Sequence, residues 1–207
     1  MREAIHALKY DRLHTASIGM GRMLAAAIEQ LAGEAPAEML VIPVPLHASK
    51  YAQRGFNQSR SLAAEALAFL RKSHPEWRLT LASSTLLRQR ATESQAGLTP
   101  RQRRQNVRGA FSVSDRARVT AQHVLVIDDI LTTGATARAA AQALVEAGAA
   151  SVWVATLARA QRAERFGSAS FYEVTEEVDP LAGASGADRN AAISSTTGST
   201  FEEQPSI

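Results

Sequence analysis

Apolar residues recur at the three- and four-residue spacing of an amphipathic helix in three segments of the chain. The first segment ends before Gly33, a residue type that commonly terminates helices, and the second follows Asn57 or Ser59, either of which can cap a helix N-terminus. The third segment, ATARAAAQALVEAGAA, is rich in the strong helix former alanine and has Gly148 near its end. The apolar faces of the first two helices comprise Ile18, Met23, Leu24, Ala27, Ile28 and Leu31, and Leu62, Ala66, Leu67 and Leu70.

Strand-like segments alternate with these helices. They are MLVIPVPL at 39–46, STLLRQR at 84–90, GAFSV at 109–113, HVLVIDDI at 123–130 and SVWVATLAR at 151–159. The uninterrupted Val/Leu/Ile run in HVLVIDDI is typical of a strand that is buried on both faces of a sheet. The alternation predicts an α/β fold, a single doubly wound domain with a mainly parallel sheet and flanking helices. We expect the segments at 84–90 and 109–113, which flank an arginine-rich stretch, to be core strands of that sheet.

The composition changes at about Gly167, where serine, threonine, glycine and alanine become frequent and neither periodicity is sustained. We therefore expect one domain over residues 1–166 and a disordered or loosely packed C-terminal tail over residues 167–207. Apolar side chains that could instead dock the tail are Phe171, Tyr172, Val174 and Phe201.

The stretch VLVIDDILTTGAT joins the most apolar strand to the alanine-rich helix. Such a turn lies at the carboxyl end of a parallel sheet, where ligands bind in open α/β folds, so Asp128 and Asp129 are expected at a site mouth. The unpaired N–H groups at the helix N-terminus favour a phosphate, and Gly134 permits a backbone conformation that a side chain resists. Carboxylates for hydroxyl groups and a loop for phosphate together predict a ribose 5-phosphate, although a carboxylate pair is also compatible with a magnesium site.

Composition and missing motifs exclude several other classes of site. The 207-residue chain has a formal charge of +3 and a sequence pI near 9.7, which suits anionic small molecules or nucleic acid. It contains no cysteine, no GxxxxGK loop, no GxGxxG fingerprint and no GxSxG elbow, and its five histidines lack metal-ligand spacing. No apolar run approaches the roughly 20 residues that span a bilayer, and the N-terminus MREAIHALKYDRLH is charged, so we expect a cytoplasmic protein.

Four segments together resemble one known family. They are ALKYD, PVPLHASKYAQRGFNQSRSLA, LLRQRATESQAGLTPRQRRQNVRGAF and VLVIDDILTTGAT, which extend from roughly Ala7 to Arg159. The last is similar to the motif with which type I phosphoribosyltransferases bind phosphoribosyl pyrophosphate (PRPP), and the others resemble the ComF/GntX-type, competence-associated branch. Many members of that branch begin with a cysteine-rich zinc-binding segment; this chain has no cysteine, so we expect any role of that segment to be absent or supplied otherwise.

The resemblance implies a role for each part of the motif. Asp128 and Asp129 would accept hydrogen bonds from the ribose, and the loop from Pro43 to Arg54 would hold pyrophosphate, with Lys50 and Arg54 as its cations. Mg²⁺ would be the cofactor, carried by PRPP without a direct protein ligand. The residues implied to hold the 5-phosphate are Thr132, Thr133, Gly134, Ala135 and Thr136.

The arginine-rich stretch between Arg88 and Arg108 resembles the mobile loop that closes over pyrophosphate in this superfamily, and it makes Arg88 and Arg90 candidate catalytic residues. The expected activity is that of a phosphoribosyltransferase, a pentosyl transferase of nucleotide metabolism, with an unidentified base or amine as acceptor. The alternative is a non-catalytic PRPP-sensing or DNA-uptake accessory protein that binds single-stranded DNA or competence proteins through such arginines. The sequence is also compatible with a homodimer.

Overall fold

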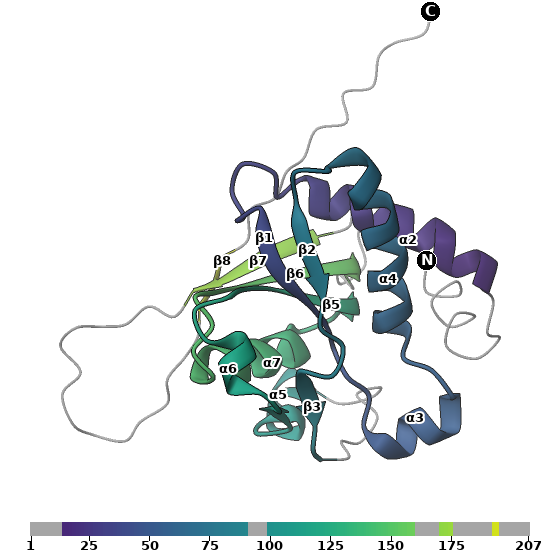
Figure 1. Ribbon diagram of the computed structural model, residues 1–207. Coiled ribbons are helices and arrows are strands. Elements are labelled where there is room, and N and C mark those ends of the chain that lie inside the picture. Colours follow the sequence, from purple (N-terminus) through teal and green to yellow (C-terminus); the bar gives the residue numbers. More distant parts are fainter. Residues whose placement is uncertain (1–13, 91–98, 160–169, 176–191, 195–207) are drawn as a thin grey trace, which may run out of the picture.

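The computed structural model describes residues 14–90, 99–159, 170–175 and 192–194 (Figure 1). Six strands form one sheet in the order β2-β1-β5-β6-β7-β8, in which β2, β1, β5 and β6 are parallel and β7 and β8 are antiparallel additions at one edge. The expected α/β fold with a mainly parallel sheet is confirmed. The strands of this sheet are β1 (Glu38–Pro43), β2 (Arg78–Leu81), β5 (His123–Leu131), β6 (Ser151–Arg159), β7 (Ser170–Thr175) and β8 (Ala192–Ser194).

Helices cover both faces of this sheet. The helices α2 (His14–Glu29) and α4 (Gln58–Ser73) pack on one face, and α7 (Ala135–Glu146) packs on the other (Figure 1). Three shorter helices complete the described residues: α3 (Ala48–Arg54), α5 (Pro100–Val107) and α6 (Arg116–Val119).

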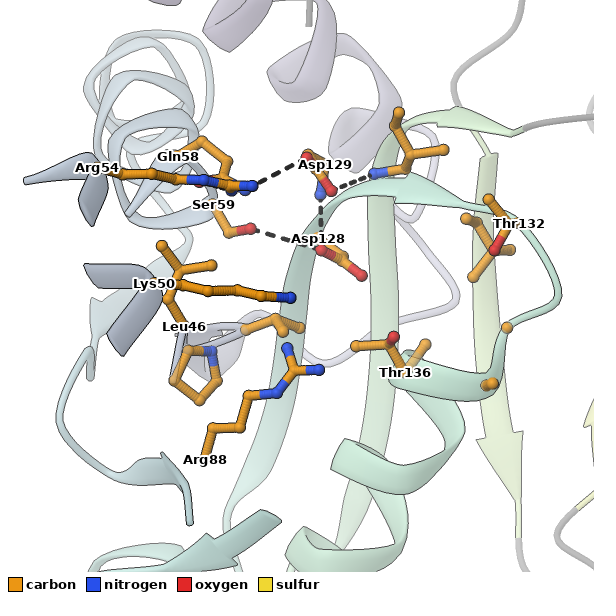
Figure 2. Close-up of a pocket in the computed structure, with 17 residues that line it drawn as sticks. Leu46, Lys50, Arg54, Gln58, Ser59, Arg88, Asp128, Asp129, Thr132 and Thr136 are labelled. Atoms are coloured by element: carbon orange, nitrogen blue, oxygen red, sulfur yellow. Dashed lines mark hydrogen bonds between the residues drawn. The ribbon is translucent and has the colours of Figure 1, made fainter. Parts of the chain in front are cut away.

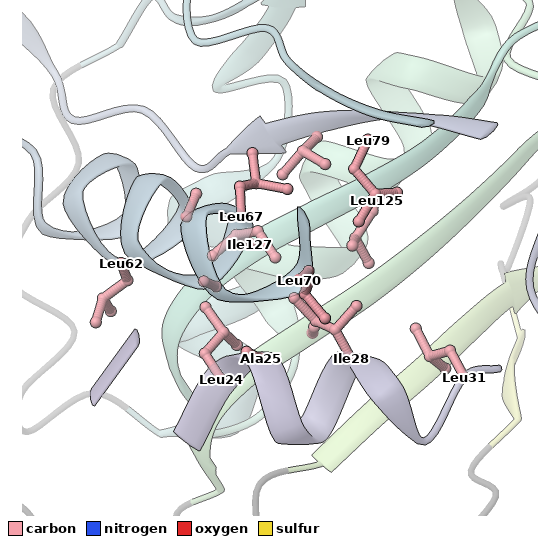
Figure 3. Close-up of a cluster of buried hydrophobic side chains, with 14 of the residues drawn as sticks. Leu24, Ala25, Ile28, Leu31, Leu62, Leu67, Leu70, Leu79, Leu125 and Ile127 are labelled. Carbon is pink, nitrogen blue, oxygen red and sulfur yellow. The ribbon is translucent and has the colours of Figure 1, made fainter. Parts of the chain in front are cut away.

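The central strand β5 divides the core into two layers. Successive side chains of a strand point to opposite faces, so Leu125 and Ile127 join the cluster under α2 and α4, whereas Val124 and Val126 join the cluster under α7. All four side chains are fully buried, which confirms the two-sided burial predicted from the uninterrupted apolar run. Figure 3 shows the first layer, where leucines of α2 and α4 meet Leu125 and Ile127.

The helix α2 lies against α4 at a glycine. A Cβ atom built on Gly21 would lie 2.3 Å from the Cβ of Glu65, so glycine is required for this close approach. The sequence spacing predicted that Ile18 and Met23 lie on the buried face of α2. This prediction is wrong, because their side chains are 41% and 45% exposed. The buried face follows Ser17, Met20, Leu24, Ile28 and Leu31, and Ile18 and Met23 lie beyond its edges.

A second, two-stranded sheet stands apart from the main one. It pairs β3 (Leu86–Arg88) antiparallel with β4 (Phe111–Val113). The expectation that these segments are core strands of the parallel sheet is therefore wrong, although Leu86 and Phe111 do pack into the layer under α7. The physical reason is that a short apolar run indicates a strand but not the sheet to which it belongs.

Part of the segment expected to be a C-terminal tail is built into the sheet. Residues Ser170–Thr175 form β7 beside β6, and Ala192–Ser194 form β8 beside β7. The remaining residues of that segment lie outside the described part of the chain, so the domain boundary at residue 166 stays a prediction. In the part of the chain that the structure describes, no helix combines the length and apolar character needed to cross a bilayer.

Candidate functional site

A pocket of about 280 Å³ opens at the carboxyl ends of β1 and β5 (Figure 2). This is the sheet edge at which the sequence predicts a site. Its walls come from four places: the end of β5, the turn into α7, the segment from the end of β1 through α3 to the start of α4, and β3. The lining residues are Val44, Pro45, Leu46, Lys50, Arg54, Gln58, Ser59, Arg88, Asp128, Asp129, Ile130, Leu131, Thr132, Gly134, Ala135, Thr136 and Ala137.

The end of β5 supplies the acidic pair. Asp128 and Asp129 are each 8% exposed, so the protein holds two carboxylates largely out of water. Backbone donors orient both groups: the N–H of Asp129 donates to Oδ1 of Asp128, and the N–H of Ile130 donates to Oδ1 of Asp129, each at 2.9 Å. The carboxylates are therefore fixed as hydrogen-bond acceptors at the pocket.

The turn after β5 forms the opposite wall. Gly134 has φ of +70° and ends the turn directly before α7, so the conformational freedom predicted for this glycine is used. Thr132, Gly134, Ala135 and Thr136 line the pocket, and the N-terminus of α7 offers backbone N–H groups there. Thr133 is not among the lining residues; its hydroxyl accepts a hydrogen bond from the N–H of Ala135 at 3.4 Å and supports the turn.

Two cations reach the pocket from α3, a helix within the segment expected to be a loop. His47 caps this helix by accepting from the N–H of Ser49 at 3.3 Å, and Gly55 closes it with φ of +78°. Lys50 and Arg54 are four residues apart, so they share one face of α3, and both line the pocket. The capping residues on either side of ASKYAQR were the local signal for this helix.

A third cation comes from the small sheet. Arg88 on β3 lines the pocket, and its guanidinium carbon lies 5.4 Å from the ring centroid of Phe111, within range of a cation–π contact. Burial lowers the pKa of Arg88 below its usual range, and the nearby Asp128 carboxylate opposes that shift. Lys50 and Arg88 extend toward Asp128 from two sides in Figure 2. A partly desolvated cation of this kind binds an anion more strongly than one in water.

Arg90 lies apart from these groups. It is exposed, does not line the pocket, and donates from one amino group to the carbonyl oxygens of Asn106 and Arg108, each at 3.0 Å. These bonds join the end of β3 to the end of α5. The structure thus brings Arg88, but not Arg90, into the pocket, and residues 91–98 of the expected mobile loop lie outside the described residues.

Two polar lining residues were not predicted to belong to the site; the sequence offered Ser59 only as an alternative helix cap, and the cap of α4 is Asn57. Gln58 and Ser59, in the first turn of α4, are 5% and 2% exposed. The Nε2 of Gln58 donates to Oδ2 of Asp129, and the Oγ of Ser59 donates to Oδ1 of Asp128, both at 3.5 Å. The one sequence feature that could have indicated them is their position: two polar residues directly after the cap residue Asn57 and before the apolar face of the helix.

The described residues contain no group of three or more histidine or acidic side chains placed to hold a metal ion. Asp128 and Asp129 are the carboxylates among the lining residues.

Known proteins match this chain at the level of both family and individual relatives. Residues 53–185 match the family described as "Phosphoribosyl transferase domain". The DNA utilization protein YhgH of Escherichia coli O157:H7 is 33% identical over 157 residues, which cover 75% of this chain. Competence protein F of Haemophilus influenzae is 31% identical over 121 residues, which cover 58% of this chain and 50% of that protein.

The chain spans 65% of the length of the matched YhgH protein. Among solved structures, the glutamine phosphoribosylpyrophosphate (PRPP) amidotransferase from B. subtilis, complexed with ADP and GMP, matches 70% of this chain and 26% of its own at 25% identity, with a TM-score of 0.41. The family match includes more than half of the chain and the lining residues from Arg54 to Ala137, but not those from Val44 to Lys50. This chain therefore belongs to the phosphoribosyl transferase domain family and has relatives named for competence and DNA utilization.

Proposed function

We propose that this protein binds PRPP together with Mg²⁺ and transfers the phosphoribosyl group to a base or amine acceptor. The observation that carries the proposal is the meeting, in one pocket, of a buried carboxylate pair, an open helix N-terminus and three cationic side chains. A ribose bearing phosphate on one side and pyrophosphate on the other requires these three kinds of partner.

Each part of PRPP has a matching wall in this assignment. The ribose hydroxyls donate to Asp128 and Asp129, whose carboxylates are held at the end of β5. The 5-phosphate lies at the turn of residues 132–136 and receives hydrogen bonds from the N-terminus of α7. The pyrophosphate faces Lys50, Arg54 and Arg88, which line the remaining side of the pocket.

Mg²⁺ fits this site as an ion carried by the ligand. Mg²⁺ prefers oxygen ligands, and its usual partners at phosphate sites are one or two carboxylates, phosphate oxygens and water. Asp128 and Asp129 are the carboxylates at this pocket, and this assignment uses them for the ribose hydroxyls, so Mg²⁺ would be held by oxygens of PRPP and by water. When bound, Mg²⁺ would add positive charge beside the departing pyrophosphate.

The chemistry asks mainly for electrostatic stabilisation from the protein. Displacement at the anomeric carbon of ribose passes through a transition state with oxocarbenium character, so no covalent nucleophile on the protein is needed. The bond to pyrophosphate breaks while the acceptor approaches, and negative charge accumulates on the leaving oxygen. In this proposal Lys50, Arg54 and Arg88, which line the pocket, stabilise that charge, and the carboxylates hold the ribose in position.

The direct test is calorimetric titration of the full chain with PRPP, with and without Mg²⁺, followed by a screen of bases and amines for pyrophosphate release. The proposal expects saturable PRPP binding that strengthens with Mg²⁺, and turnover with at least one acceptor. Absence of PRPP binding would contradict it. Binding without turnover would favour a PRPP-sensing protein instead.

A DNA-uptake accessory role is the second candidate, and the names of the relatives favour it. Arg101 is exposed on α5; the Arg103 and Arg104 side chains lie outside the described residues. If these arginines contact single-stranded DNA, the affinity should fall as the salt concentration rises. The slope of log affinity against log salt should be about −0.7 for each phosphate that they neutralise. Salt-dependent binding of an oligonucleotide would support this role, and its absence in low salt would contradict it.

A further inference from the structure

The first turn of α4 places two buried polar side chains against the acidic pair. Gln58 donates to Asp129 and Ser59 donates to Asp128, although 71 and 69 residues separate the partners in the sequence. Figure 2 shows both side chains facing the end of β5 from the α4 side of the pocket. Buried polar groups are costly unless they are hydrogen-bonded, so the position of these two side chains beside the carboxylates needs an explanation.

The start of α4 is tied to the strand that carries those carboxylates. Asn57 caps α4 by accepting from the N–H of Arg60 at 3.3 Å, and its amide donates to the carbonyl oxygen of Val44 at 3.0 Å. The N–H of Val44 in turn donates to the carbonyl oxygen of Ile127 at 2.8 Å, and Ile127 directly precedes Asp128. This chain of hydrogen bonds fixes the position of the first turn of α4 relative to the end of β5.

The amide of Gln58 bridges two parts of the pocket. Its oxygen accepts from a guanidinium nitrogen of Arg54 at 3.4 Å, while its nitrogen donates to Asp129 at 3.5 Å. Only this orientation suits both neighbours, because the flipped amide would present its oxygen to a carboxylate and its N–H₂ group to a cation. Gln58 therefore joins a cation of the pyrophosphate side to a carboxylate of the ribose side.

We propose that Gln58 is a positioning residue that keeps Asp129 and Arg54 aligned for a single ligand that contains both ribose and pyrophosphate. This inference rests on the function proposed above, and it assigns Gln58 no contact with the ligand. It differs from a purely structural role, in which Gln58 would only satisfy a buried carboxylate and its loss would lower stability without changing PRPP affinity.

The substitution Gln58→Glu separates these roles because its effect depends on pH. The charged form places a carboxylate against Asp129 and attracts Arg54 away from pyrophosphate. The protonated form carries an O–H group that can donate to Asp129 as the amide does. Burial at 5% exposure and the facing carboxylate both raise the pKa of the introduced group, and they are opposed by Arg54, which is half-buried. We expect burial and the facing carboxylate to outweigh Arg54, because solvent screens the charge of a half-buried guanidinium. The folded-state pKa of the introduced group would then exceed its unfolded value, so the native contact would be retained at low pH and lost as pH rises.

The matched control is Gln142→Glu. Gln142 is exposed on α7 and also donates to a carboxylate, Glu146, at 3.1 Å, so the control makes the same charge change outside the pocket. The experiment is calorimetric titration with PRPP and excess Mg²⁺ between about pH 5 and pH 8 for the wild type, Q58E, Q142E and Q58M. Dividing each variant's affinity by that of the wild type at the same pH cancels the titration of PRPP itself.

The proposal predicts that Q58E binds PRPP roughly 10- to 150-fold more weakly than the wild type at the upper pH, the scale of a lost hydrogen bond to a charged group, and that this deficit becomes clearly smaller toward the lower pH. Q58M, which fills the same volume without a donor, should show a deficit that does not change with pH, and Q142E should match the wild type throughout. Full affinity in Q58M, or a Q58E deficit that is the same at every pH, would overturn the proposal.

Failure of the positioning role can be distinguished from failure of the proposed function by wild-type PRPP binding together with melting temperatures recorded without ligand. If the wild type does not bind PRPP, both inferences fall, whereas normal wild-type binding with unaffected Gln58 variants overturns the positioning role alone. A Q58E melting temperature that falls relative to Q142E as pH rises would still show that Gln58 contacts Asp129. Should Q58E not fold, Q58M decides between the two roles.

Discussion

Gly134 offers a test of the turn that is assigned to the 5-phosphate. In Gly134→Ala, a side chain is forced to adopt φ of +70°, a left-handed conformation that costs about 1–2 kcal/mol outside glycine. Part of this cost is offset because alanine restricts the unfolded chain by about 0.4–1 kcal/mol. The net loss of about 1 kcal/mol should lower the melting temperature by about 2–4 °C in a domain of this size.

Gly33→Ala is the matched control for this strain. Gly33 has φ of +92°, and a Cβ atom built there meets nothing within 4 Å, so this substitution imposes left-handed strain beyond the end of α2 without steric conflict. The two variants should therefore lose comparable stability. They should differ at the pocket, because Gly134 lines it and Gly33 does not.

The difference should appear in PRPP affinity. If the turn relaxes away from φ of +70°, the N-terminal N–H groups of α7 move relative to the phosphate, and losing one hydrogen bond to a charged group costs about 1.5–3 kcal/mol. Calorimetry should then show G134A binding PRPP roughly 10- to 150-fold more weakly, with G33A at the wild-type value. Equal affinities for all three proteins, with both variants destabilised, would refute the assignment of the phosphate to this turn.

Three further predictions concern other parts of the molecule. Gly21→Ala should destabilise the fold by about 1–3 kcal/mol in urea unfolding, because the added Cβ would collide with Glu65. In Gly19→Ala, a control in the same helix, the added Cβ meets nothing within 4 Å, so this variant should be neutral or stabilised by up to ~1 kcal/mol. Equal effects of the two substitutions would contradict the close approach of α2 and α4. Arg88→Lys should weaken the binding of pyrophosphate about 10-fold, because lysine lacks the planar guanidinium and its contact with Phe111, but should leave the affinity for ribose 5-phosphate unchanged. Calorimetric titration with pyrophosphate and with ribose 5-phosphate checks this, and equal losses for the two ligands would argue against a pyrophosphate role. Replacing Arg101, Arg103 and Arg104 by alanine should reduce pyrophosphate release or PRPP affinity if the segment that carries them, which forms α5, closes over pyrophosphate. A variant that keeps both properties but loses oligonucleotide binding in a fluorescence assay would favour the DNA-uptake role.

The centre of the site is predictable from sequence because its parts are contiguous. The strand, the acidic pair and the glycine turn into α7 occupy a single stretch, and the rule that ligands bind at the carboxyl ends of parallel strands then locates them. The cations Lys50 and Arg54 follow from the family pattern, and the structure places both at the pocket.

The parts that escaped prediction depend on long-range contacts or on weak local signals. Gln58 faces Asp129 only because Asn57 and Val44 hold α4 against β5, and no local pattern reports a contact between residues so distant in sequence. The helix α3 has no buried residue, so it lacks the apolar periodicity by which helices are recognised. Arg88 and Arg90 are two residues apart, so a continuous strand would place both on the same face. They are separated in space because β3 ends at Arg88 and Arg90 is bonded to the carbonyl oxygens of Asn106 and Arg108.

The account depends most on the acidic pair as the ribose partner, and a calorimetric titration of the Asp128→Asn, Asp129→Asn double variant with PRPP and Mg²⁺ tests it most directly. Asparagine keeps the shape of the side chain but removes its charge and half of its acceptor capacity. Asp115→Asn is the control, since Asp115 caps α6 away from the pocket and asparagine caps equally well. We predict that the double variant loses at least about 100-fold in PRPP affinity, at about 1.5 kcal/mol or more for each charged hydrogen-bond acceptor, while the control binds as the wild type does. A correctly folded double variant with wild-type affinity for PRPP would contradict the central claim.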